Sequence, residues 1–251
     1  MAGLERFAGK VGVITGGASG IGLAIATRFV SEGGKIVIGD FNTSNFEEIT
    51  KKLGADNCAC FFVDVSKRPT VDALVEKTYE TFGRFDVMFG NAGIQIFNDF
   101  LTFTEEDHDR VFAVNYKGVF NTSQAAGRAF VAHDTKGVIV NTASINVRCA
   151  CQNSAPYTAT KGAIAALTRA VAVELAKYGI RANCVCPGST ETAMTSGLAK
   201  DRFPTYTAPR LSIQRMATPE EQAGVYCFLA SDDASYITGE SIFSVGGWGI
   251  S

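Results

Sequence analysis

Short apolar runs of strand length alternate with helix-length segments along almost the whole chain. Seven runs have the composition of buried strands, at 10–15, 35–40, 58–63, 85–89, 137–141, 180–186 and 241–245. Five segments between them suit helices, at 21–31, 46–53, 69–82, 107–133 and 157–178. Alternation of this kind is typical of a parallel sheet covered on both faces. The pattern therefore predicts an α/β fold: one doubly wound domain around a seven-stranded, mostly parallel sheet.

The size and composition of the chain fit one such domain. Its 251 residues are 46% hydrophobic and 19% charged, which is typical of a globular protein with a sizeable core. A net charge of −2 excludes a generally basic surface for nucleic acid. The apolar runs are too short to span a membrane, and no apolar stretch follows the charges of residues 1–10. We expect a cytoplasmic protein with no nucleic-acid or membrane partner.

The cysteines predict neither a metal site nor a disulfide framework. Six of the seven lie in three Cys-x-Cys pairs, which lack the spacing of zinc ligands, and the chain has two histidines. An odd number of cysteines in a cytoplasmic chain favours reduced thiols. The pairs at 58/60 and 184/186 are expected to be buried, because free cysteine behaves as a small hydrophobe.

A glycine-rich turn joins the first predicted strand to the first predicted helix. It runs Thr15-Gly-Gly-Ala-Ser-Gly-Ile-Gly22, with Ser19 and Ile21 between the glycines. Gly16, Gly20 and Gly22 allow a tight turn and a close approach of the backbone to a ligand. The helix that follows offers free N–H groups and the positive end of its dipole to a pyrophosphate. This segment is therefore predicted to bind a dinucleotide.

Acidic residues at two strand ends bear on which dinucleotide binds. Asp40 ends the second strand, where a carboxylate can accept hydrogen bonds from an adenine ribose and would repel a 2′-phosphate. Phe41 and Asn42 follow it, so no cation lies next to it in sequence, and NAD is favoured over NADP. Asp64 and Val65 would contact the adenine. The alternatives are a solvated strand-end carboxylate at Asp40 and a turn-forming aspartate at Asp64.

Ser144, Tyr157 and Lys161 form a second group of candidate residues. Tyr157 and Lys161 are four residues apart on one predicted helix, so they share a face, and Ser144 follows the fifth strand. Oxidation of an alcohol by hydride transfer needs a base for the hydroxyl proton, and a tyrosine of ordinary pKa, about 10, is a poor one. A nearby ammonium lowers that pKa, which would explain Lys161, while Ser144 could hold the reacting oxygen.

In this combination the chain resembles the short-chain dehydrogenase/reductase family, over about residues 7–247. The resemblance rests on motifs in the family's order: the glycine turn, Asn91-Ala92-Gly93, Asn115, Ser144, Tyr157-x-x-x-Lys161 and Pro187-Gly188. It implies a Rossmann-type fold and hydride transfer with a nicotinamide cofactor.

The resemblance also implies a role for each matching residue. Asn91, Ala92 and Gly93 would support the cofactor. Asn115 would interrupt its helix and help hold a water in a proton relay, and Tyr157 would be the general acid/base. Lys161 would bind the nicotinamide ribose and lower the Tyr157 pKa. Pro187, Gly188, Thr190 and Thr192 would line the nicotinamide end, although Thr190 replaces a residue that is usually branched and apolar.

The same resemblance places the substrate between three segments. They supply Gln95, Asn146, Arg148, Cys151 and Gln152, and a lid at about 190–215 that closes over the substrate. Arg148 could bind a carboxylate, with a solvated or interfacial arginine as the alternative. The polar residues suggest a substrate with several polar groups.

The sequence is compatible with three functions. The first is an NAD-dependent dehydrogenase or reductase that acts on a secondary alcohol or its ketone, such as a polyol, sugar or hydroxylated ring. The second is an NADPH-dependent biosynthetic ketoreductase, such as a 3-oxoacyl reductase, and the third is a catalytically silent, dinucleotide-sensing interaction protein. The extended apolar faces of the helices at 107–133 and 157–178 suggest a homotetramer, because related proteins pack such helices across two-fold axes.

Overall fold

A seven-stranded parallel sheet forms the centre of the computed structural model, which describes residues 5–196 and 207–249. The strand order is β3-β2-β1-β4-β5-β6-β7, and all six neighbouring pairs are parallel. The strands are β1 Val11–Thr15, β2 Lys35–Asp40, β3 Cys58–Phe62, β4 Val87–Gly90, β5 Val138–Thr142, β6 Arg181–Pro187 and β7 Ser241–Ser244. The predicted fold class is therefore confirmed, and the sheet is parallel throughout instead of mostly parallel.

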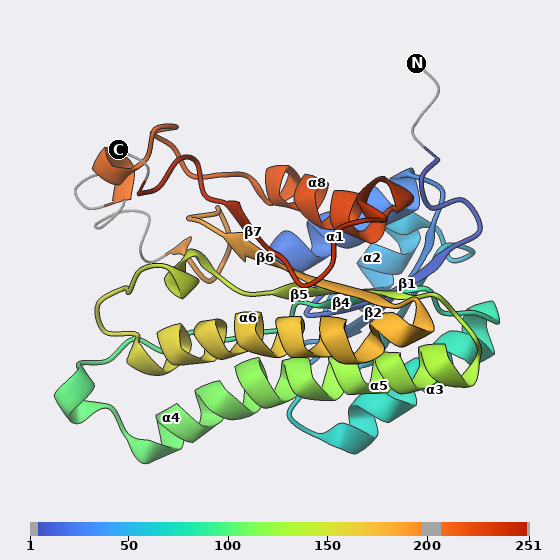
Figure 1. Cartoon of the computed structure of the whole chain (residues 1–251), viewed down its shortest axis with the longest axis horizontal. Helices are drawn as coiled ribbons and strands as arrows, with labels where there is room; N and C mark the ends of the chain where they lie inside the picture. Colours follow the sequence, from blue (N-terminus) through green and yellow to red (C-terminus); the bar gives the residue numbers. More distant parts are fainter. Residues whose placement is uncertain (1–4, 197–206, 250–251) are drawn as a thin grey trace.

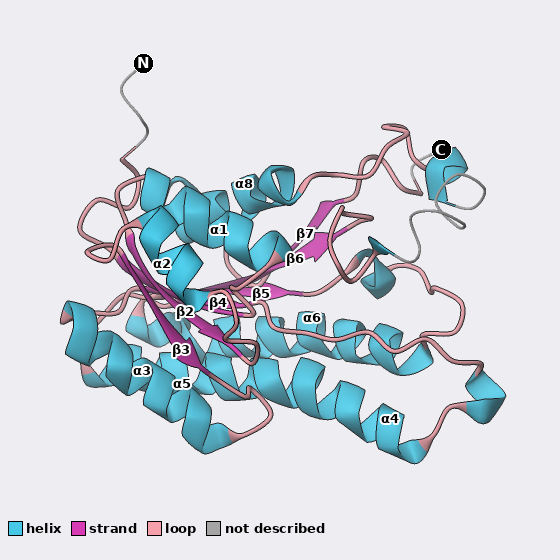
Figure 2. Cartoon of the chain, turned by 180° about the vertical axis from the view of Figure 1, so that it is seen from behind, coloured by secondary structure: helices cyan, strands magenta, loops and turns pink. Residues whose placement is uncertain are grey.

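Helices cover both faces of this sheet (Figures 1 and 2). One layer holds α1 Gly20–Ser31, α2 Phe46–Leu53 and α8 Pro219–Ala230. The opposite layer holds α3 Arg68–Phe82, α4 Glu105–Val111, α5 Gly118–Ala132 and α6 Ala155–Leu175. Strand β1 shows why both layers form: every residue in it is buried, with Ile14 in the α1 and α8 core and Val13 in the α3 and α5 core.

Two helical features differ from the sequence prediction. The single helix expected at 107–133 is divided into α4 and α5 by a π-helical segment, Phe112–Lys117, which contains Asn115. Helix α8 was not predicted at all, because it is apolar on several sides and shows no helical stripe. Its start carried a usable signal: Thr218 and Glu221 form a capping box, and Pro219 follows the N-cap residue.

Candidate active site

A cavity of about 720 Å³ lies at the carboxyl ends of the central strands. Its lining includes Gly16 after β1, Asn91 after β4 and Ser144 after β5, together with Pro187 at the end of β6. Successive strands are added on one side of β1 as far as β3 and then on its other side, beginning with β4, so the order of strands reverses between β1 and β4. Ligands of doubly wound sheets bind at such a reversal, so the fold itself places a binding site here.

The glycine turn forms one wall of this cavity and fits a pyrophosphate. A Cβ atom on Gly22 would lie 2.0 Å from the carbonyl oxygen of Gly16, so only glycine lets α1 begin this close to the turn. Ser19 is the N-cap residue of α1, and its side chain makes no capping hydrogen bond. The first N–H groups of α1 therefore remain available to an anion. Ser19, Gly20 and Ile21 line the cavity as well.

Asn91 ties this turn to the end of β4. Its Nδ2 donates to the carbonyl oxygens of Thr15 at 3.1 Å and Gly16 at 3.0 Å. Its Oδ1 accepts a hydrogen bond from the hydroxyl of Thr142 at 3.2 Å. Ala92 and Gly93 continue along the cavity wall. The amide of Asn91 thus sets the distance between the phosphate-binding turn and the centre of the sheet.

The carboxylate of Asp40 lies against the glycine turn at the far end of the cavity. Its Oδ2 accepts from the N–H of Ala18 and its Oδ1 from the N–H of Asn42, each at 2.9 Å. Asp64 and Val65 line the same end, and Asp64 forms a turn by accepting from the N–H of Ser66 at 3.0 Å and from its hydroxyl at 2.7 Å. Phe41, which no sequence motif indicates, also lines the cavity and is 70% exposed.

Ser144, Tyr157 and Lys161 meet at the opposite end of the cavity. Ser144 is buried after β5, where its Oγ accepts from the N–H of Asn146 at 3.2 Å. Burial raises the pKa of Tyr157 to about 12, although a hydrogen bond with Ser144 acts in the opposite direction. Burial also lowers the pKa of Lys161 to about 8. At pH 7 the Tyr157 side chain is therefore a neutral phenol, and the Lys161 side chain is an ammonium that loses its proton more easily than an ordinary lysine.

Lys161 lies near Tyr157, and its ammonium contacts the end of β5. The Lys161 Nζ donates to the carbonyl oxygen of Thr142 at 2.8 Å and lies 5.4 Å from the centre of the Tyr157 ring. Burial is the larger influence on Tyr157, and its pKa lies above the ordinary value instead of below it. In this structure the ammonium therefore holds the end of β5.

The π-helical segment turns Asn115 toward the loop after β4. Its Oδ1 accepts from the N–H of Ile94 at 2.8 Å, and its Nδ2 donates to the carbonyl oxygen of Ile94 at 2.9 Å. A Cβ atom on Gly93 would lie 3.3 Å from the Asn115 Oδ1 and 3.6 Å from the Lys161 Nζ. Both polar groups thus border the space beside Gly93, which a side chain would fill. The interruption of the helix that the resemblance implied is present at Asn115.

The segment after β6 closes the same end of the cavity. Pro187, Gly188, Thr190 and Thr192 all line it. Thr190 is 3% exposed and donates through Oγ1 to the carbonyl oxygen of Gly188 at 3.0 Å, so its side chain stabilises the turn. Of the lid predicted at 190–215, residues 197–206 lie outside the described residues.

The structure brings some of the expected substrate residues to the cavity. Gln95, Asn146 and Cys151 line it. Arg148 and Gln152 are absent from the described lining, and the Arg148 guanidinium stacks 3.5 Å from the centre of the Phe243 ring, a contact that neither the carboxylate-binding nor the solvated or interfacial arginine described. Arg110 and Val114 line the cavity and were not predicted, because nothing in a helical sequence shows which exposed residues face a ligand.

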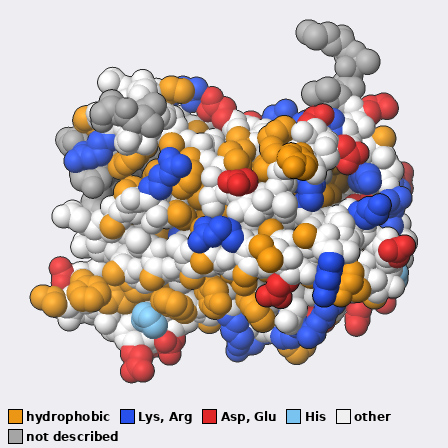
Figure 3. Space-filling view, in the orientation of Figure 1, with side chains coloured by type: hydrophobic (Ala, Val, Ile, Leu, Met, Phe, Trp, Pro, Cys, Tyr) orange, Lys and Arg blue, Asp and Glu red, His pale blue; other side chains and the backbone are white. Residues whose placement is uncertain are grey.

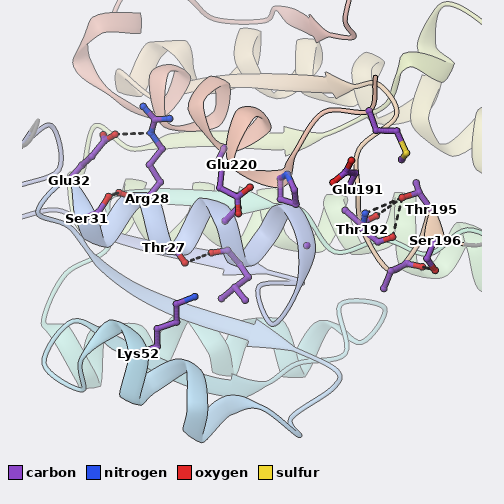
Figure 4. A pocket seen from close by; sticks show the side chains of 17 residues that line it. Thr27, Arg28, Ser31, Glu32, Lys52, Glu191, Thr192, Thr195, Ser196 and Glu220 are labelled. Atoms are coloured by element: carbon purple, nitrogen blue, oxygen red, sulfur yellow. Dashed lines mark hydrogen bonds and ion pairs between the residues drawn. The ribbon is translucent and has the colours of Figure 1, made fainter. Parts of the chain in front are cut away.

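A second cavity, of about 900 Å³, lies between α1, α8 and residues 191–196 (Figure 4). It shares Gly20, Thr192, Ala193 and Thr195 with the first cavity. An ion pair between Arg28 and Glu32, 2.8 Å long, lies on its wall. Ser144, Tyr157 and Lys161 are not part of its described lining, so the smaller cavity is the candidate active site.

The cysteines of the described residues form no group of metal ligands. In the described ranges, no three His, Cys, Asp or Glu side chains are grouped closely enough to hold a metal ion. Cys58, Cys184 and Cys186 are buried as expected, whereas Cys60 is half-buried, and all seven thiols are unpaired. No helix between residues 5 and 196 or between 207 and 249 combines the length and apolar character needed to cross a membrane.

Comparison with known proteins places the whole chain in one family. The family model described as enoyl-(acyl carrier protein) reductase matches residues 16–249. The chain is 37% identical to 3β-hydroxysteroid dehydrogenase 2 of Eggerthella lenta, over 96% of this chain and 95% of that protein. A short-chain type dehydrogenase/reductase from Mycobacterium marinum has a TM-score of 0.93 and 31% identity, with 99% and 98% of the two chains covered. For the 3-ketoacyl-(acyl-carrier-protein) reductase of Brucella melitensis, complexed with NADH, the TM-score is 0.89 and the identity 32%, with 96% and 98% covered. The protein therefore belongs to the short-chain dehydrogenase/reductase family of NAD(P)-binding oxidoreductases that act on CH–OH groups.

Proposed function

We propose that the protein is an NAD(H)-dependent oxidoreductase that interconverts a secondary alcohol and its ketone. The observation that carries the proposal is the layout of the 720 Å³ cavity, with Asp40 and the glycine turn at one end and Ser144, Tyr157 and Lys161 at the other. A bound nicotinamide dinucleotide would supply or accept the hydride. Gly16, Gly20 and Gly22 would hold its pyrophosphate, Asp40 its adenine ribose, and Pro187, Gly188, Thr190 and Thr192 its nicotinamide end.

The protein's own groups then handle the proton. The Tyr157 hydroxyl, a neutral phenol in the cofactor-free protein, gives its proton to the carbonyl oxygen during ketone reduction and takes one back during alcohol oxidation. Ser144 orients the substrate oxygen by hydrogen bonding. Lys161 holds the nicotinamide ribose, and Asn115 and Lys161, whose polar atoms both border the space beside Gly93, take part in the proton relay.

The choice of NAD over NADP rests on the Asp40 carboxylate. A 2′-phosphate there would face a fixed negative charge that already accepts hydrogen bonds from Ala18 and Asn42. A relative named as a 3-ketoacyl-(acyl-carrier-protein) reductase is itself complexed with NADH. The NADPH-dependent ketoreductase remains the second candidate, and the silent dinucleotide sensor the third.

The substrate we propose is a small molecule with more than one polar group, such as a polyol, a sugar or a hydroxylated ring. Gln95 and Asn146 supply polar contacts near Tyr157, and Cys151 supplies an apolar wall. The relative from Eggerthella lenta is named for a hydroxyl group on a steroid ring. We also propose that the protein works in the cytoplasm as a homotetramer, and that residues 190–215 form the substrate lid.

One pair of measurements tests this function. Nicotinamide fluorescence is titrated with NADH and with NADPH, on the wild type and on Tyr157→Phe, and turnover of secondary alcohols is assayed with NAD⁺. We expect tight NADH binding and weak NADPH binding by both proteins, and loss of turnover only in Tyr157→Phe, because the variant lacks the transferable proton. Preferred binding of NADPH would establish the ketoreductase, and turnover by Tyr157→Phe would rule out its role as acid/base.

A further inference from the structure

The tyrosine on α8 has its hydroxyl buried next to the end of β5. Tyr226 is 0% exposed, and its Oη donates to the Thr142 Oγ1 at 2.9 Å. Burial raises the pKa of Tyr226 far above its ordinary value, so the hydroxyl keeps its proton and remains a donor. None of the roles proposed above uses this residue, and it lies outside the described lining of the cavity.

The direction of every hydrogen bond from Tyr226 to the glycine turn is determined. The carbonyl oxygens of Thr15 and Gly16 can only accept, so the Nδ2 of Asn91 must face them. The Oδ1 of Asn91 consequently faces Thr142, whose single hydroxyl proton must be donated to it. Because that proton is committed, the Thr142 oxygen accepts the proton of Tyr226. Each donated hydrogen thus has one acceptor, and the chain of bonds has one arrangement.

Thr142 also contacts the other half of the site through its backbone. Its carbonyl oxygen accepts the hydrogen bond from the Lys161 Nζ at 2.8 Å. One residue therefore positions the amide of Asn91 with its side chain and the ammonium of Lys161 with its main chain. A displacement of the Thr142 backbone would disturb the phosphate-binding turn and the proton-handling end together.

We propose that Tyr226 is a positioning residue for cofactor binding, which acts by locking the Thr142 hydroxyl onto Asn91. The proposal rests on the proposed function, because it assumes that the glycine turn holds a dinucleotide. Without the Tyr226 hydroxyl, the proton of Thr142 is free to rotate away from the Oδ1 of Asn91. The amide of Asn91 is then less constrained, and the turn it supports loses part of its preorganisation.

Tyr226→Phe tests the proposal, because it removes one oxygen and keeps the buried ring. We expect the dissociation constant for NADH to rise about fivefold, the loss of roughly one net hydrogen bond. Tyr79→Phe is the matched control: the Tyr79 hydroxyl is buried and has no hydrogen-bond partner in the described part of the chain. NADH binding by this control should equal that of the wild type.

A second set of variants separates positioning from simple support of the core. Thr142→Val removes the intermediate hydroxyl with little change of shape and should weaken NADH binding about tenfold, whereas Thr142→Ser keeps the hydroxyl and should bind within about twofold of the wild type. Adding Tyr226→Phe to Thr142→Val should change nothing further, because the residue acts through Thr142.

Three results would overturn the proposal. They are unchanged NADH binding by Tyr226→Phe, a fully additive double variant, and weakened binding by Thr142→Ser equal to that of Thr142→Val. A wild-type protein that binds neither NADH nor NADPH would overturn the proposed function and this inference together. Normal wild-type binding with an unaffected Tyr226→Phe would overturn this inference alone.

Discussion

The ammonium of Lys161 opposes folding at neutral pH. The side chain is 3% exposed, and burial lowers its pKa from an ordinary 10.5 to about 8. Between these two pH values the unfolded chain binds the proton more tightly than the folded protein does. The free energy of unfolding therefore rises with pH across this window, and below pH 8 the burial of the charge costs about 3 kcal/mol. A residue kept at such a cost is typical of an active site.

Replacement by an apolar side chain of similar length should reverse that cost. We predict that Lys161→Met raises the free energy of unfolding at pH 7 by about 2 kcal/mol, once the loss of the hydrogen bond to Thr142 is subtracted. The same variant should lose turnover. Urea denaturation at pH 7 and pH 10 would measure the gain, most of which should vanish at pH 10, because the folded lysine is then neutral and the unfolded lysine is close to its own pKa of 10.5.

An exposed lysine provides the control for this experiment. Lys51→Met, on the solvent side of α2, should leave the free energy of unfolding unchanged at both pH values. A Lys161→Met variant that is less stable than the wild type at pH 7 would show that the ammonium contributes more through its contacts than it costs through burial.

At the scale of elements, the sequence predicted the strands and the glycine turn and missed what only packing decides. Thr15–Gly22 and the long helix that carries Tyr157 and Lys161 have local signals, namely glycine spacing and the shared helical face. Helix α8 is recognisable only by its cap, because its residues are buried on several sides. The contact of Tyr226 with Thr142 joins residues 84 apart in the chain, so no local pattern announces it.

Glu32, at the C-terminal end of α1, joins three parts of the fold. It accepts hydrogen bonds from Arg28 of the same helix at 2.8 Å and from Arg6 of the preceding segment at 2.7 Å. Arg6 also lies 3.6 Å from Asp233, which follows α8. Burial alone would raise the pKa of Glu32, and the hydrogen bonds from Arg6 and Arg28 outweigh it and lower the pKa. The carboxylate therefore contributes stability at neutral pH.

We predict that Glu32→Gln lowers the free energy of unfolding at pH 7 by about 2 kcal/mol, because two guanidinium groups lose their shared carboxylate. The value is below that of a fully buried pair, since the Arg28 side chain is 38% exposed. The difference should disappear as the pH falls from the ordinary carboxyl pKa through the lowered one, where the wild-type carboxyl protonates. Chemical denaturation between pH 7 and pH 3 measures it. Glu76→Gln, on the exposed side of α3, should show no change at any pH.

At the scale of the whole molecule, one face carries more apolar surface than a monomer needs. Phe120 on α5 is 39% exposed and Val173 on α6 is 79% exposed. Phe100 and Leu101, in the loop before α4, are 75% and 90% exposed. Figure 3 shows hydrophobic side chains gathered in a band over α5 and α6. Surfaces of this kind are typical of contacts between subunits, which supports the proposed homotetramer.

If this face joins subunits, a single negative charge placed on it should weaken the tetramer. Wild-type protein should sediment as four chains, and Val173→Glu should raise the dissociation constant across this face about a hundredfold, because it buries an unpaired carboxylate. Thr81→Glu, which adds the same charge to an exposed position on α3, should leave the assembly intact. A monomeric wild type, measured by sedimentation velocity, would contradict the proposal.

The strand order β3-β2-β1-β4-β5-β6-β7 also determines which parts of the sheet can form during synthesis of the chain. The neighbouring strands β3, β2, β1 and β4 all lie within residues 11–90, so four of the seven strands can pair while the other three are still being synthesised. Helix α1 belongs to that early half, yet it packs against α8, which ends at Ala230. The apolar residues of α1 that contact α8 therefore stay uncovered until α8 has been synthesised, and a product that terminates before α8 would expose them to recognition by chaperones.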